Sequence, residues 1–203
     1  MGRWLMRAAA AVLVTACWIG AAAANPDARA VVETFSQSLI GVMKEAKTLG
    51  FEGRFRRMGE TVDRAFDLPF MTRLAVGGSW STMAPEQRDK LVAAFRRFTL
   101  ATYASRFEGY NGERIVVAPD VTVQRSGVVV GTQLIQDDND PVTLNYLLHE
   151  ADGGWRIVDV FLTGTISELA TRRAEFAAVI RQRGLDGLIL LLDERATAMA
   201  AGR

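Results

Sequence analysis

The chain has 203 residues, of which 49% are hydrophobic and 23% are charged, as in an ordinary globular protein. This composition excludes a disordered or fibrous chain. The 24 basic and 23 acidic residues nearly balance, whereas nucleic-acid-binding proteins normally carry a basic excess, so we expect no nucleic-acid partner.

The first 24 residues predict a secretory signal peptide. Arg3 and Arg7 precede an alanine-rich apolar run, and the small residues that end at Ala24 fit a cleavage site. We therefore expect cleavage after Ala24, export to the periplasm, and a single domain over residues 25–203 that works as a monomer.

Two other interpretations of this segment stay open. The small residues before Cys17 also fit a bacterial lipoprotein signal, although an apolar stretch follows where a polar tether is expected. An uncleaved membrane anchor is the other alternative, for which the apolar run is barely long enough. Cys17 is the only cysteine, so cleavage after Ala24 would leave a domain held by its core without disulfide bonds.

Apolar residues recur every three to four positions in the first half of the domain, which predicts amphipathic helices over 27–47 and 53–66. Asp67 is a predicted N-cap for a further short helix that ends at a glycine pair, since a proline follows within its first turn. A longer helix opens at Pro85 and closes near residues 106–109.

From residue 114 the apolar period changes to two, which predicts strands. These cover residues 114–118, 121–125, 128–136, 142–150 and 155–162, and the first two could be one strand kinked at Pro119. Short turns between them predict antiparallel hairpins. Helical spacing returns at Ile166 and, after Gly184, over residues 185–192. This order predicts an α+β domain with a twisted antiparallel sheet of four to five strands.

The strand 155–162 is apolar on both faces. Trp155, Ile157 and Phe161 alternate with a second apolar set, whereas a sheet with one wet face alternates apolar and polar residues. Either helices cover both faces around a filled core, or one face lines an interior that holds an apolar molecule such as an acyl chain.

If such an interior exists, apolar side chains of the helices and strands are its predicted lining. These candidate lipid-binding residues are Phe66, Leu68, Phe70, Met71, Leu74, Trp80, Phe95, Phe98, Tyr103, Val130, Leu144, Tyr146, Val158, Val160 and Leu162.

Residues suited to catalysis or metal binding are few. His149 is the only histidine, which excludes a histidine cluster for a metal, and we expect it to be a solvated or rim side chain. Asp159 stands among apolar neighbours, so we expect it to pair with an arginine or to cap backbone groups. The alternative is a general base, because a curved sheet after helices is similar to the scaffold of ketosteroid-isomerase-like enzymes.

Other charged residues have ordinary explanations. Asp137, Asp138 and Asp140 lack the glycine and glutamate of an EF-hand loop and fit a hairpin tip. Arg172-Arg173 and Arg181 fit a solvated helix face, with an anionic partner or lipid headgroup as the alternative.

Several segments occur in an order that resembles one family. They are FDLPFMTR at 66–73, GSW at 78–80, PEQR at 85–88, FRRFTLATY at 95–103, GWRIVDV at 154–160, Gly164, RAEF at 173–176 and GLDGL at 184–188. Together they resemble the MlaC or toluene-tolerance family of ABC-transporter auxiliary proteins. Within that family, FLTGTISELATRR at 161–173 looks most like the hopanoid-associated HpnM branch.

This resemblance implies an NTF2-like fold, with helices wrapped about the sheet and an apolar cavity between them. It implies a non-enzymatic periplasmic carrier of a hopanoid or a phospholipid, with bound lipid as cargo and no cofactor. Its partners would be an inner-membrane transporter and, transiently, the membranes. A carrier predicts a continuous cavity of several hundred Å³, walled by helices 67–76 and 166–183 that move. The alternatives are a small isomerase-like enzyme and a non-carrying adaptor with a filled core.

Overall fold

The computed structural model describes residues 26–136, 139–151 and 153–202. The predicted signal peptide, its cleavage after Ala24 and the lipoprotein alternative at Cys17 lie outside the described residues. So do Asp137 and Asp138 of the predicted hairpin tip. Within the part of the chain that the structure describes, no helix is long and apolar enough to cross a membrane.

Helical structure occupies the first half of the domain, as the spacing of apolar residues predicts. Its elements are α1 (Pro26–Lys44), α2 (Ala46–Ala65), α3 (Leu68–Val76), the 3-10 helix η1 (Gly77–Thr82) and α4 (Pro85–Arg106). α2 begins earlier than predicted, because the backbone of Gly50 at φ +59° kinks the helix instead of ending it.

Asp67 caps α3 as predicted. Its Oδ1 accepts a hydrogen bond of 2.9 Å from the backbone N–H of Phe70, and Pro69 stands in the first turn where its missing N–H is harmless. The glycine pair that follows ends α3 but not the helical winding, which continues as η1.

The second half forms a five-stranded antiparallel sheet and a last helix. The elements are β1 (Arg114–Gln124), β2 (Gly127–Gln136), β3 (Asn139–Ala151), β4 (Gly154–Leu162), β5 (Ile166–Ser167) and α5 (Glu168–Ala200). The strands pair in chain order. β1 is continuous, with an irregular register between Val117 and Val121, so the interpretation of one strand kinked near Pro119 is confirmed. Gly184, at φ +69°, kinks α5 into two halves.

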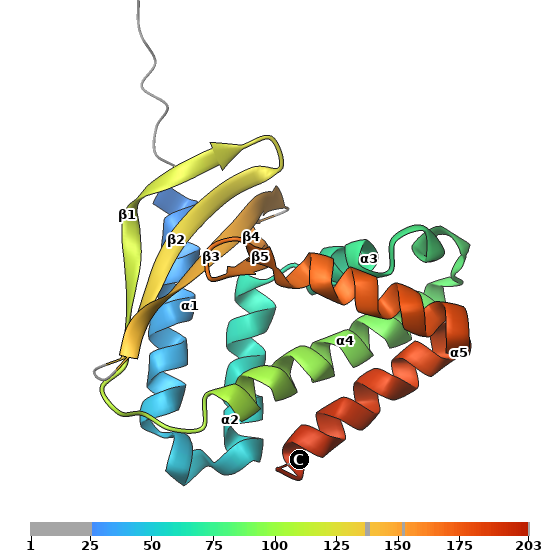
Figure 1. Cartoon of the computed structure of the whole chain (residues 1–203), viewed down its shortest axis with the longest axis horizontal. Coiled ribbons are helices and arrows are strands. Elements are labelled where there is room, and N and C mark those ends of the chain that lie inside the picture. Colours follow the sequence, from blue (N-terminus) through green and yellow to red (C-terminus); the bar gives the residue numbers. More distant parts are fainter. Residues whose placement is uncertain (1–25, 137–138, 152, 203) are drawn as a thin grey trace, which may run out of the picture.

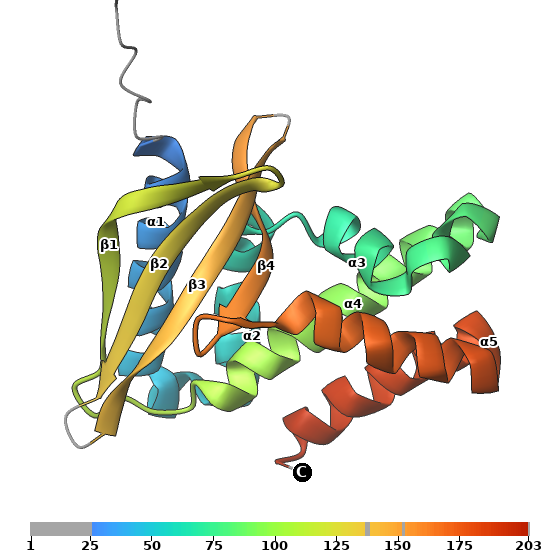
Figure 2. The same ribbon diagram turned by 45° about the horizontal axis from the view of Figure 1, so that its top comes forward.

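The helices lie on one side of the curved sheet, as Figures 1 and 2 show. Burial follows this arrangement, since alternate residues such as Val128 and Val130 of β2 and Leu148 of β3 are buried and their neighbours are not. The alternative with helices on both faces is therefore wrong.

A β-bulge interrupts β4. Leu147 of β3 pairs with Asp159, but the adjacent Leu148 pairs with Ile157, so Val158 has no partner of its own. Val158 is buried all the same, because a bulged residue can share the side of the residue before it.

The bulge changes which residues of β4 share a face. Ile157, Val160 and Leu162 pair with alternate residues of β3 that face the helices, whereas Asp159 and Phe161 fall on the other face. The predicted grouping of Ile157 with Phe161 is wrong. A prediction that assumes strict alternation assigns every side chain beyond the extra residue of a bulge to the wrong face of the sheet.

The core centres on an aromatic cluster between α1 and the sheet. The ring of Phe35 meets Phe66 at 5.1 Å, Tyr103 at 5.6 Å and Tyr146 at 6.0 Å between centroids, all edge to face. Phe66 is held in place by the backbone, because the next residue, Asp67, donates its N–H to the carbonyl of Ile157 at 3.0 Å. This cluster forms the floor of the site described next.

Candidate functional site

An apolar cavity of about 140 Å³ lies between the sheet and the helices. The sheet side is formed by Leu144, Tyr146, Val160 and Leu162 of β3 and β4. The helix side comes from α1, α3, α4 and α5, and Phe66, just before α3, also lines the cavity. The cavity is thus built where the helix-facing surface of β4 meets the start of α5.

Nine of the fifteen predicted lining residues surround this cavity. They are Phe66, Met71, Phe95, Phe98, Tyr103, Leu144, Tyr146, Val160 and Leu162. The sequence pattern found them because they fall on the apolar faces of helices and strands that converge here. Contact of these residues with a lipid stays a prediction.

The other six lie elsewhere. Leu68, Val130 and Val158 are buried in the core away from the cavity. Phe70 packs on the ring of His149 at 4.4 Å between centroids, and Trp80 lies under the guanidinium of Arg88 at 5.4 Å.

Leu74 is the sixth, and it is 37% exposed on α3. The pattern places these six residues on the apolar faces of helices and strands. It cannot separate side chains that fill a core from those that line a cavity. Their positions do not place them at this site.

Eight further lining residues lie outside the predicted set, although Arg172 was considered there as an alternative contact for a lipid headgroup. They are Leu39, Thr99, Thr102, Arg106, Phe107, Glu168, Leu169 and Arg172. Five of the eight are polar or charged, and these stand in the second half of α4 or at the start of α5. The four-residue spacing of Glu168 and Arg172 on a helix is the signal that could have indicated a charged pair there.

Aromatic rings and neutral hydroxyls dominate the inner part of the cavity. Tyr103 stacks on Phe107 with 5.9 Å between ring centroids. Burial raises the pKa of Tyr146 and raises that of Tyr103 well above its ordinary value, so both phenols are neutral at physiological pH. The inner cavity is therefore uncharged.

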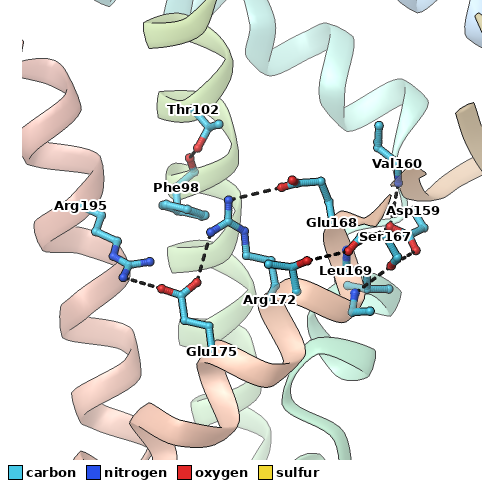
Figure 3. A network of polar contacts seen from close by, with 12 residues as sticks. Phe98, Thr102, Asp159, Val160, Ser167, Glu168, Leu169, Arg172, Glu175 and Arg195 are labelled. Atoms are coloured by element: carbon cyan, nitrogen blue, oxygen red, sulfur yellow. Dashed lines mark hydrogen bonds and ion pairs between the residues drawn. The ribbon is translucent and has the colours of Figure 1, made fainter. Parts of the chain in front are cut away.

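The outer wall of the cavity carries a chain of ion pairs within α5. Figure 3 shows Arg172 between Glu168 and Glu175, with N···O distances of 3.4 and 3.2 Å. Arg195, beyond the kink of the same helix, reaches Glu175 at 2.5 Å. The guanidinium of Arg172 also lies over the ring of Phe98 at 4.9 Å, which joins the charged wall to the apolar one.

Glu175 is ionised in this arrangement. Burial by itself would raise the pKa of Glu175, but the hydrogen bonds and charges of Arg195 and Arg172 outweigh burial and hold that pKa below its ordinary value. At neutral pH Glu175 therefore faces Arg172 and Arg195 as a carboxylate.

A second, more open cleft of about 400 Å³ adjoins the cavity. Its lining residues are Phe98, Thr102, Ser105, Arg106, Arg172, Arg195, Ala198 and Met199. Four of these, Phe98, Thr102, Arg106 and Arg172, line the cavity as well. The two spaces therefore meet along the last turns of α4.

Asp159 caps the start of α5 and does not line the cavity. Its carboxylate accepts hydrogen bonds from the backbone N–H groups of Val160 (2.8 Å) and Leu169 (3.0 Å) and from the hydroxyl of Ser167 (2.5 Å). The expectation that Asp159 caps backbone groups is confirmed. Three donors occupy its oxygens, as Figure 3 shows, so the carboxylate holds β4 to α5.

His149 also has a structural partner. Its Nε2 lies 2.9 Å from Oδ2 of Asp67, and the imidazole is about one-fifth exposed, which agrees with the expected rim position. The pair joins β3 to the N-terminus of α3. Among the described residues no group of three or more His, Cys, Asp or Glu side chains is placed to hold a metal ion.

The cavity is smaller than the several hundred Å³ expected of a carrier. A cavity of about 150 Å³ accommodates a benzene-sized molecule, and drug-sized ligands occupy pockets of about 300–1,000 Å³. The rings of Phe98, Tyr103 and Phe107 are among those that line this space. A long acyl chain needs more room than the cavity offers, so we expect the walls to move apart when such a chain binds.

Comparison with known proteins agrees with the fold. The sequence model of the MlaC protein family matches residues 33–194, which is most of the chain. Among solved structures, the chain is similar to a phospholipid-binding protein from Ralstonia solanacearum in complex with a phospholipid, at 26% sequence identity and a TM-score of 0.76. That match covers 86% of this chain and 99% of the other. The chain therefore belongs to the MlaC protein family.

Proposed function

We propose that this protein binds a lipid and carries it through the periplasm between membranes, together with an inner-membrane transporter. The observation that carries the proposal is the apolar cavity between β4, α4 and α5. It is supported by the family match and by the similar Ralstonia protein that binds a phospholipid. In this proposal residues 1–24 direct export and residues 25–203 form the monomeric carrier.

The hydrophobic effect supplies enough free energy for binding. Transfer of one methylene from water to an apolar surrounding is favourable by about 0.8 kcal/mol, so a tail of roughly fifteen methylenes gains about 12 kcal/mol on full burial. Part of that gain is spent on separating the walls. An uncharged inner cavity lined by Phe95, Phe98 and Tyr146 suits such a tail.

The walls that open are α3 and the first half of α5. α3 is short and joined to η1 by Gly77 at φ +58°, while the turn between β4 and β5 contains Gly164 at φ +81°. Segments attached through such positions can rotate with little backbone strain. The sheet and α4 form the fixed side.

The cargo is a lipid with one or more long apolar tails. The resemblance of residues 161–173 to the HpnM branch favours a hopanoid, and the similar Ralstonia protein favours a phospholipid. The position of Asp159 outside the cavity counts against the isomerase alternative. The presence of a cavity counts against an adaptor with a filled core.

The proposal is tested by measuring bound lipid. Protein purified from its own periplasm is examined by native mass spectrometry, and purified protein is then incubated with vesicles to measure uptake. We expect a bound lipid in the first experiment and uptake in the second. Lipid-free protein together with no uptake would contradict the proposal.

A matched pair of variants ties uptake to the cavity. Val160→Trp fills the cavity from its sheet side and should reduce uptake at least tenfold. Val123→Trp adds the same ring on β1, where the side chain is 71% exposed, and should leave uptake unchanged. Equal uptake by both variants would show that the lipid binds elsewhere.

A further inference from the structure

Three arginines and two glutamates gather where the cavity meets the adjoining cleft. Arg106 comes from the end of α4, Arg172 from the first half of α5 and Arg195 from the second half. Glu168 and Glu175 lie among them. The kink at the middle of α5 is what brings residues more than twenty positions apart to the same place (Figure 3).

The charges in this group do not cancel. Both glutamates are engaged by Arg172 and Arg195 at 2.5–3.4 Å. Among the described residues Arg106 has no carboxylate within 4.0 Å, and it is exposed at the edge of both spaces. The group therefore carries one excess positive charge, which Arg106 contributes.

The geometry places this excess charge at the polar end of a bound lipid. Arg106 and Arg172 line the cavity as well as the cleft, so a molecule with its tail in the cavity and its polar end in the cleft passes beside both of them. Thr102 and Ser105 add hydroxyl groups to the same surface. A polar group at the end of an apolar tail would meet two guanidinium groups and these hydroxyls on leaving the cavity.

We propose that this cleft binds the phosphate of an anionic lipid headgroup, with Arg106 as the group that discriminates. The inference rests on the proposed lipid carriage and adds the class of headgroup to it. A guanidinium binds a phosphate through two parallel charge-assisted hydrogen bonds, which a neutral alcohol or sugar cannot match. Arg172 and Arg195 are held in fixed directions by Glu175, so they present N–H groups to the cleft with little loss of side-chain entropy.

The test measures a ratio between two lipids with identical tails. Vesicles containing equal amounts of phosphatidylglycerol and diacylglycerol are incubated with the protein, and native mass spectrometry gives the ratio of the two bound lipids. We expect the wild type to prefer phosphatidylglycerol. In Arg106→Gln the ratio should fall about five- to tenfold, the size of one lost hydrogen bond at an exposed position.

A matched control and a second variant keep the test decisive. Arg181→Gln removes the same charge from an exposed position on α5 outside both spaces and should keep the wild-type ratio. Arg106→Lys keeps the charge without the paired donors and should give an intermediate ratio. An unchanged ratio in Arg106→Gln would overturn the inference.

Competition by inorganic phosphate separates a headgroup site from a site for the free ion. Millimolar phosphate should lower the uptake of phosphatidylglycerol relative to diacylglycerol. Phosphate binding that is lost in Arg106→Gln while the lipid ratio stays unchanged would assign the cleft to the free ion and contradict the headgroup role. Uptake of neither lipid by the wild type would contradict the carrier function itself, whereas uptake of both without preference would contradict only this inference.

Discussion

The two halves of strand β4 face the same helices but meet them differently. Before the bulge, Ile157 is fully buried, and its carbonyl accepts a backbone hydrogen bond from Asp67 next to the aromatic cluster. After the bulge, Val160 and Leu162 are half-buried and line the cavity. The first half contacts fixed side chains, whereas the second half contacts the start of α5.

This difference shows how one strand can serve both stability and binding. Close packing at Ile157 leaves no room for adjustment, since protein interiors have the density of organic crystals. At Leu162 the neighbouring surface is a cavity, and the contact across it can change without loss of the fold. The bulge at Val158 separates the closely packed part of β4 from the part that lines the cavity within a few residues.

The largest expected effect on stability is at Ile157. Ile157→Ala should lower the free energy of unfolding by about 3 kcal/mol, because it removes buried methyl groups and leaves a void in a rigid surrounding. Leu162→Ala should lower it by about 1 kcal/mol, because this side chain is already only half-buried. Chemical unfolding measures both values. Equal losses in the two variants would mean that the cavity wall is as rigid as the core.

A smaller effect is expected at Asp159, which joins the second half of β4 to α5. Asp159→Ala leaves the donors of Leu169 and Ser167 without their acceptor and should lower the free energy of unfolding by about 2 kcal/mol. Asp159→Asn keeps one acceptor oxygen and should lose about half as much. Hydrogen exchange should show faster exchange of the Leu169 amide in both variants. An unaltered exchange rate at Leu169 would mean that the start of α5 is not held in place by the carboxylate of Asp159.

The smallest expected effect concerns Glu175 of α5 and how the free energy of unfolding depends on pH. The folded state holds the pKa of Glu175 below its ordinary value of 4.5, so its carboxylate stabilises the fold above that pH. This stabilisation is lost as the pH falls through the lowered pKa. The loss should be less than about 1 kcal/mol, because the pairs with Arg172 and Arg195 are partly solvated.

Glu175→Gln isolates this contribution from the other carboxylates. The difference in unfolding free energy between wild type and variant should be constant above about pH 5 and shrink on acidification. Urea unfolding over a pH series measures it. A difference that grows as the pH falls would have the wrong sign for an ionised, paired Glu175.

The sequence predicted most of the fold because its helices and strands carry strong local signals. Pro85 opens α4 and Asp67 caps α3 as expected, since capping depends on neighbouring residues. β5 was missed because two residues are too few to show a period. The bulge at Val158 was missed because it is defined by pairing with β3, which no local pattern contains.

The site was predictable in part of its apolar lining and not in its polar part. Phe98 and Val160 follow helix and strand periods, so their convergence could be expected from the sequence. Arg106 and Arg195 lie on separate elements and meet only because α5 turns back at its kink. Charged residues that come together through tertiary structure leave no periodic signal in the chain.

The small volume of the cavity sets a limit on apparent affinity. If a lipid enters only the form in which α3 and α5 stand apart, its apparent dissociation constant is the intrinsic one divided by the fraction of molecules in that form. The free energy of opening, which includes separating contacts such as that of Arg172 over Phe98, is thereby subtracted from the gain on burying a tail. A transporter that holds the walls apart would change this affinity without touching the lipid, so loading and release could be governed at the same hinge.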